Sequence, residues 1–106
     1  MHEYQLRYLP QFHKDLKNCK KYISEILLNP QAADDFIDET ESAILERQDK
    51  AEAFEPYHSR KERKYPYYRI YEKNYIVFYV VIPEGNQKVM EVRRFLFGKS
   101  NWKQKI

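Results

Sequence analysis

YYRIYEKNYIVFYVV, residues 67–81, is the stretch that decides the fold. Near its start the apolar residues Tyr68 and Ile70 flank Arg69, so an extended chain would place the arginine on the opposite face from both. The dipeptide KN then predicts a tight turn, in which the asparagine takes the left-handed conformation. Residues 75–82, YIVFYVVI, are apolar throughout and predict a central strand covered on both faces or nearly so. We therefore expect a β-hairpin in the middle of a sheet.

A third strand follows this hairpin. After the turn residues PEGN, the segment QKVMEVRRFLF at 87–97 predicts a strand that Gly98 ends, so the three strands form an antiparallel meander. Strict alternation would place four residues on one face of the last strand: Met90, Val92, Arg94 and Leu96. Arg93 would then point to the opposite face, and residues 99–106 would form a basic tail.

The first half of the chain predicts one strand and two helices. Residues 3–9, EYQLRYL, alternate as a half-buried strand does. Residues 11–28 then follow the helical period, and the dipeptide NP at 29–30 supplies an N-cap and a proline at the first helical position of a second helix. This helix runs to about residue 49, and the short connection predicts an antiparallel helix hairpin. A polar connection at 50–65 leads to the meander.

These elements predict a single α+β domain over residues 1–106, in which the helix hairpin covers one face of a mostly antiparallel sheet. The single cysteine, Cys19, falls on the apolar side of the first helix and reads as a small core residue in a reducing compartment. No apolar run is long enough for a signal peptide or a membrane span, so we expect a cytoplasmic protein without membrane contact. Neither a zinc-type Cys/His spacing nor a glycine-rich loop occurs, so no metal or other cofactor is expected.

Charge is divided unevenly along the chain. Residues 1–55 hold 7 Lys/Arg and 12 Asp/Glu, whereas residues 56–106 hold the remaining 12 Lys/Arg and only 4 Asp/Glu. The stretch HSRKERKYPYYR at 58–69 concentrates the positive charge beside tyrosines. Such a distribution predicts a face that binds a polyanion, and a solvated basic loop is the alternative.

Three segments of this chain resemble the RelE/ParE superfamily of bacterial toxins, the toxic components of type II toxin–antitoxin modules. They are NPQAADDFIDE at 29–39, YYRIYEKNYIVFYVV at 67–81, and VMEVRRFLFGKSNW at 89–102. The resemblance covers nearly the whole chain and implies a cognate antitoxin as partner. It also implies one of two targets: the ribosome and its mRNA, which RelE-like members cleave, or DNA gyrase, which ParE-like members inhibit.

The resemblance carries candidate residues onto this sequence. Arg69 matches the strand arginine of the family and is the best candidate for holding a scissile phosphate, with a salt bridge to Glu91 as the structural alternative. Lys61 is a candidate for proton exchange. Arg94 matches an arginine of the last strand and is either catalytic or buried and paired. The residues expected to bind nucleic acid are Arg60, Arg63, Lys64, Lys99 and Trp102.

The chain departs from the RNA-cleaving pattern at two positions. Phe97 stands where many such members carry a basic residue or a histidine, and it transfers no proton. Trp102 stands in place of a tail tyrosine, and it stacks on bases without supplying an ionisable group. We therefore predict a RelE-like ribosome-dependent mRNA endonuclease, with a ParE-like gyrase inhibitor or a catalytically weak nucleic-acid-binding relative as the alternatives.

Overall fold

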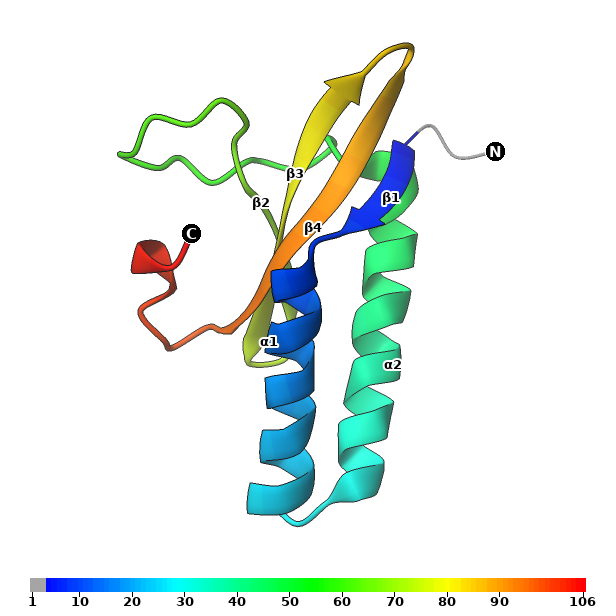
Figure 1. Cartoon of the computed structure of the whole chain (residues 1–106), viewed down its shortest axis with the longest axis vertical. Helices are drawn as coiled ribbons and strands as arrows, with labels where there is room; N and C mark the ends of the chain where they lie inside the picture. The colour runs from blue at the N-terminus through cyan, green and yellow to red at the C-terminus, as the bar shows by residue number, and fades with distance from the viewer. Residues whose placement is uncertain (1–3) are drawn as a thin grey trace.

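Two helices pack on one face of a four-stranded sheet in this computed structural model, which describes residues 4–106 (Figure 1). The main elements are β1 (Tyr4–Tyr8), α1 (Pro10–Lys21), α2 (Pro30–Arg47), β2 (Tyr68–Glu72), β3 (Tyr75–Glu84) and β4 (Gln87–Phe97). A π-helical turn, Tyr22–Ile26, extends α1, and 3₁₀ turns lie at Gln48–Lys50 and Trp102–Gln104. The expected α+β class and element order are confirmed, although residue 3 of the expected first strand lies outside the described residues.

The sheet has the strand order β1-β4-β3-β2. Strands β2, β3 and β4 form the expected antiparallel meander, and β1 pairs with β4 in parallel. This pairing reaches only as far as Val92, so the remainder of β4 has no strand on that side. None of the helices in the described residues has the length and apolarity that a bilayer span requires.

The main core lies between the sheet and the helix hairpin. Cys19 of α1 is buried there, as expected, and Phe36 of α2 packs against Phe95 of β4. The first helix differs from the expectation at its end. The helical spacing of residues 11–28 predicts that Ile26 and Leu27 lie on the apolar face, but both are exposed because the tip of the hairpin extends past the end of the sheet (Figure 1).

A β-bulge in β4 overturns the strict alternation expected there. Tyr79 pairs with Val92 and Phe78 pairs with Arg94, so Arg93 has no partner on β3. One extra residue in a strand reverses the faces of all residues beyond it. Val92 and Phe95 consequently both join the helix-side core, and Leu96 lies in the hydrophobic cluster of the opposite face.

The turn between β2 and β3 also differs from the expectation in one detail. The left-handed residue is Lys73, with φ 53°, and Asn74 does not share that conformation. Asn74 instead supplies a main-chain carbonyl that accepts a 2.7 Å hydrogen bond from the Gly98 N–H. A Cβ at Gly98 would lie 3.2 Å from that carbonyl oxygen, so glycine permits the close approach of the tail to this turn.

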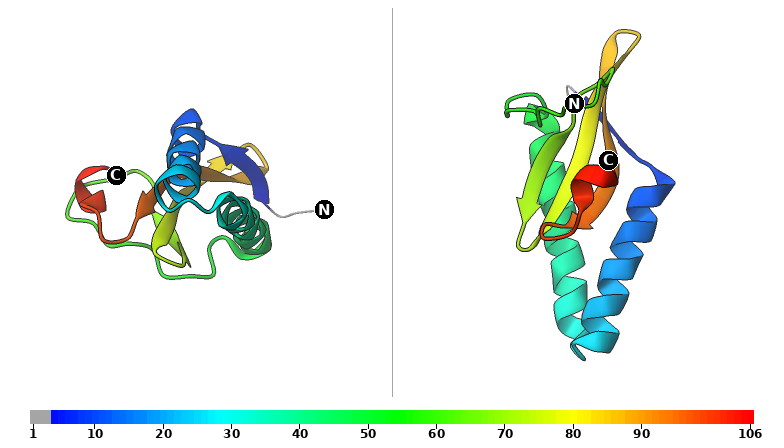
Figure 2. Two further views of the ribbon diagram at one scale, coloured as in Figure 1. Left: turned by 90° about the horizontal axis from the view of Figure 1, so that it is seen from below. Right: turned by 90° about the vertical axis from the view of Figure 1, so that its left-hand side faces the viewer.

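The sheet face opposite the helices is also covered, by segments that the sequence did not place there. The connection after α2 and the C-terminal tail both lie against it, on the side of the molecule away from β1 (Figure 2). A second hydrophobic cluster forms there from strand residues such as Phe78 and from Tyr57 and Trp102 of the two covering segments. The connection and the tail are thereby brought together over the sheet.

Candidate nucleic-acid interface

Arg69 lies at the centre of the candidate site. It projects from β2 on the face away from the helices, opposite Phe78 of β3, and is half-buried. Its guanidinium carbon lies 5.3 Å from the ring centre of Tyr57 and 5.8 Å from that of Tyr71. Two aromatic faces therefore hold the guanidinium group through cation–π contacts. Within residues 4–106, no carboxylate forms an ion pair with it.

Glu91, the structural alternative for pairing with Arg69, is bound elsewhere. Its carboxylate lies 2.7 Å from Arg7 Nη2 and 2.8 Å from Arg93 Nε, and the residue is 6% exposed. Burial alone would raise the pKa of Glu91, but the hydrogen bonds from Arg93 and Arg7 outweigh burial and leave its pKa below the ordinary value. Arg93 and Arg7 therefore each have a carboxylate partner, and Arg7 has a second one in Glu84, whereas Arg69 has none within the described residues.

The basic loop, residues 58–64, adjoins the tail. Lys61 Nζ and Arg63 Nη2 donate hydrogen bonds of 3.3 and 2.9 Å to the main-chain oxygen of Ile106. The Arg63 guanidinium also lies 4.8 Å from the ring centre of Tyr67, which ties the loop to the sheet. Arg60 and Lys64 are exposed to solvent.

The tail completes the surface. Trp102 packs on Tyr57 and Phe78, with ring centres 5.2 and 5.1 Å apart, so the indole belongs to the second hydrophobic cluster and is only partly accessible. Lys103 lines a hollow of about 470 Å³ together with Arg60 and Lys61 of the basic loop. Cations that are distant in the sequence are therefore adjacent in space.

Arg94 lies at the free edge of β4 and is paired. Its Nε and Nη2 atoms donate to the Asp15 carboxylate at 2.7 and 3.1 Å, and its Nη1 donates to the main-chain oxygen of Lys105 at 3.1 Å. Asp15 also accepts from the Phe95 N–H at 3.0 Å, a donor left without a strand partner where β1 ends. This arginine therefore connects α1, β4 and the tail.

We group the cations of the loop, of β2 and of the tail as the basic face: Arg60, Lys61, Arg63, Lys64, Arg69, Lys99 and Lys103. Among them, Arg60, Lys61 and Lys103 line one hollow, and Arg69 contacts Tyr57, which lines the same hollow. Arg94 is not included, because its guanidinium group donates its hydrogen bonds to Asp15 and to the main-chain oxygen of Lys105. Tyr57 and Tyr71 were not predicted from the sequence as site residues, although both flank Arg69. For Tyr71 a signal existed, because it shares a strand face with Arg69 by alternation, whereas nothing in the sequence indicates that Tyr57 folds back onto the sheet.

Chemically, this arrangement is suited to binding phosphates. A guanidinium group pairs with two phosphate oxygens at once, and the surrounding cations lower the energy of a phosphate at the same place. Aromatic rings beside cations are typical of proteins that bind single-stranded nucleic acid.

Comparison with known families gives one match. A model described as "ParE toxin of type II toxin-antitoxin system, parDE" matches residues 6–102. A search of curated proteins gave no significant match. The matched range begins within β1 and ends at Trp102, so it includes every residue of the basic face except Lys103.

Proposed function

We propose that this chain, which belongs to the ParE toxin family of type II toxin–antitoxin systems, acts as a ribosome-dependent mRNA endonuclease whose basic face holds the scissile phosphate. The family implies a cognate antitoxin as its partner. The basic face is also the surface that an acidic segment of this antitoxin would cover, since the same cations attract carboxylates and phosphates.

One observation carries the proposal. Arg69 is held between two tyrosine rings, is neutralised by no carboxylate of residues 4–106, and stands beside the cations of the loop and the tail. A guanidinium that serves only structure normally has a carboxylate or carbonyl partner, as Arg93 and Arg94 do here. An arginine oriented by its neighbours and left without an anion is instead suited to receive one.

The reaction would be a transesterification within the RNA. The 2′-oxygen attacks the adjacent phosphorus, the bond to the 5′-oxygen of the next nucleotide breaks, and a 2′,3′-cyclic phosphate and a free 5′-hydroxyl result. Arg69 stabilises the added negative charge on the phosphorane. The Lys61 ammonium, which lines the same hollow as Tyr57, gives the proton to the leaving oxygen, and the proton of the 2′-hydroxyl passes to water.

Dependence on the ribosome would follow from what the basic face lacks. Phe97 and Trp102 contribute no ionisable group to it. Alignment of the 2′-oxygen with the leaving oxygen is a large share of the rate increase in such reactions. We assign this alignment to the decoding site of the ribosome, which holds the mRNA while Arg69 engages its phosphate.

Inhibition of DNA gyrase is the second candidate. It is favoured by the same two departures, because Phe97 is exposed and Trp102 is packed on Tyr57 and Phe78, and neither transfers a proton. A toxin that only binds its target needs no proton donor.

Two parallel assays separate the candidates. Purified toxin is incubated with mRNA alone and with mRNA on programmed ribosomes, and cleavage is mapped by primer extension; the same protein is added to a gyrase supercoiling reaction. The proposal expects cuts only in the presence of ribosomes and unaltered supercoiling. Intact mRNA together with blocked supercoiling would replace it with the gyrase assignment.

A further inference from the structure

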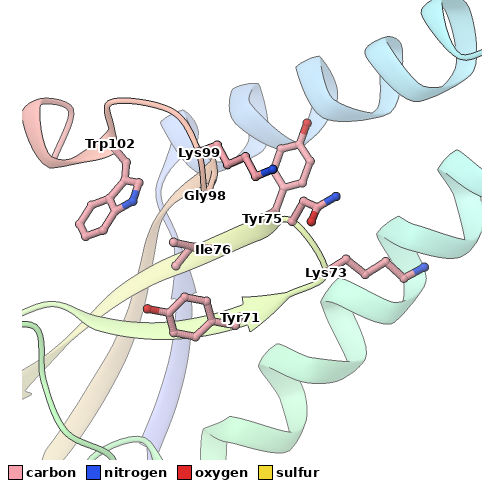
Figure 3. A pocket seen from close by; sticks show the side chains of 8 residues that line it. Tyr71, Lys73, Tyr75, Ile76, Gly98, Lys99 and Trp102 are labelled. Carbon is pink, nitrogen blue, oxygen red and sulfur yellow. The ribbon is translucent and has the colours of Figure 1, made fainter.

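A pocket beside Arg69 has the composition of a nucleobase site. It has a volume of about 360 Å³ and lies where the β2–β3 turn meets the beginning of the tail. Figure 3 shows Trp102 and Tyr71 with Ile76 between them, and Gly98 and Lys99 above. Its walls are thus two aromatic rings, its floor is an aliphatic side chain, and a cation lies at its rim.

Of the two lysines that line this pocket, one forms an ion pair within the protein and the other faces solvent. Lys73 points away toward α2, where its ammonium lies 3.2 Å from the Glu39 carboxylate (Figure 3). Lys99 is exposed and has no carboxylate partner within the described residues. The pocket therefore offers one cation without a counter-ion, and Tyr71, 63% exposed, presents most of its ring to solvent.

The pocket is connected to the phosphate-binding centre through Tyr71. The ring of Tyr71 lines the pocket and also holds the Arg69 guanidinium at 5.8 Å. On the other side, Trp102 lines the pocket and contacts Tyr57, which is the second ring against Arg69. A ligand with a flat ring in the pocket would therefore have its attached phosphate close to Arg69.

From this geometry we infer that the pocket is a subsite for one nucleobase, adjacent to the phosphate bound by Arg69. The base stacks on Tyr71 and Trp102, and Lys99 pairs with its flanking phosphate. This inference rests on the proposed function, since it gives that site its contact with the nucleotide. Stacking on aromatic rings tolerates every base, so the subsite adds affinity and fixes the position of the chain more than it selects a sequence.

The single tryptophan of the chain makes the inference testable in solution. Because Trp102 is the only indole, its fluorescence reports changes at this side chain, which lines the pocket. Toxin freed of its antitoxin is titrated with an RNA tetranucleotide, and separately with tripolyphosphate, which carries charge but no base. Saturable quenching by the RNA and none by tripolyphosphate is the expected result.

Two pocket variants and two control variants test whether the RNA binds in this pocket. Tyr71→Ala should weaken the apparent affinity for the tetranucleotide about tenfold, because one stacking partner is lost, and Lys99→Ala should weaken it less and mainly at low salt. Tyr22→Ala and Lys14→Ala, which change an exposed tyrosine and an exposed lysine of the helix hairpin, should leave it unchanged. Circular dichroism of each variant confirms that the fold is retained.

The outcomes distinguish this subsite from the proposed function. Equal quenching by tripolyphosphate, no saturable quenching by RNA, or an unchanged affinity of Tyr71→Ala would each overturn the subsite, even if the wild type cleaves mRNA on ribosomes. Base-dependent quenching that is lost in Tyr71→Ala would establish the subsite, even if the ribosome assay shows no cleavage and the proposed function fails.

Discussion

At the scale of single residues, three arginines of the sheet differ in the groups that bind their guanidinium. Arg93 shares the buried Glu91 carboxylate with Arg7, and Arg94 is bound by Asp15, whereas Arg69 is held only by the faces of two tyrosine rings. The sequence alone left the roles of Arg69 and Arg94 open, because alternation indicates the face of a strand and not the carboxylate that reaches it. The partner of Arg94 is Asp15, a buried acid on a helix face otherwise expected to be apolar.

The Glu91 carboxylate makes stability depend on pH. Its pKa is lowered in the folded protein, so its contribution to the free energy of unfolding is present above its unfolded pKa and is lost as the pH falls through the folded value. Glu91→Gln should therefore cost about 1–3 kcal/mol near neutral pH and flatten the decline between about pH 5 and pH 3. Urea unfolding over this range measures both effects.

The matched control for this prediction is Glu46→Gln, which changes an exposed acid of α2. It should keep the wild-type pH dependence. Parallel stability curves for the wild type and Glu91→Gln would show that the two arginines do not hold this carboxylate in its charged form.

At the scale of elements, hydrophobic periodicity predicted the positions of the strands and helices. It failed at the bulge in β4 and at the exposed tip of the helix hairpin. The apolar run of β3 and the helical spacing of α2 were sufficient to predict these two elements, because both are covered along most of their length. The bulge at Arg93 was missed, although two consecutive polar residues between Val92 and Phe95 are a visible break in alternation. The exposed hairpin tip was missed because periodicity does not show where a sheet ends.

Asp15 joins α1 to the unpaired edge of β4, and its removal should be costly. Asp15→Ala would leave the Phe95 N–H and the Arg94 guanidinium without their carboxylate, so we expect a loss of about 3 kcal/mol in the free energy of unfolding. Asp35→Ala on the exposed side of α2 is the comparison and should change stability by less than about 0.5 kcal/mol. Equal effects in chemical denaturation would mean that Asp15 does not link the two elements.

The hairpin connection contains a strained residue. Leu28 has φ 53°, a region that disfavours side chains, and it is 80% exposed, so it gains little from burial. Leu28→Gly should raise the free energy of unfolding by about 0.5 kcal/mol, because relief of strain exceeds the added entropy of the unfolded chain. Leu27→Gly, at a residue with ordinary φ, should instead lower it. Thermal unfolding of both variants tests this difference in sign.

At the scale of the whole molecule, the fold separates charge into two regions. The acidic first half forms the helix hairpin, and the basic second half forms the loop and the tail on the other face of the sheet (Figure 2). This division and most residues of the basic face were predicted from the sequence. That the tail and the connection after α2 fold over the sheet was not, because their joining depends on the long-range packing of Tyr57 and Trp102.

Binding of single-stranded RNA should reflect this division in its salt dependence. Combined replacement of Arg60, Lys61 and Lys64 by alanine should reduce the slope of log affinity against log salt by about 2, since each phosphate contact contributes about 0.7. Replacement of three exposed lysines of α1, Lys14, Lys17 and Lys21, should leave the slope unchanged. Fluorescence anisotropy at several salt concentrations measures these slopes, and equal reductions in both variants would indicate binding to net charge instead of to one face.

The most direct measurement is the cleavage of ribosome-bound mRNA by Arg69→Ala, compared with Arg69→Lys and the wild type. Arg69 bonds to α2 only through its main-chain oxygen, which accepts from Arg47 Nη1, so the substitution should leave the fold intact by circular dichroism. We predict that cleavage falls by about 100-fold or more in Arg69→Ala and is only partly restored by lysine, which lacks the planar pair of donors. Undiminished cleavage by a folded Arg69→Ala protein would contradict a phosphate-binding role for this arginine.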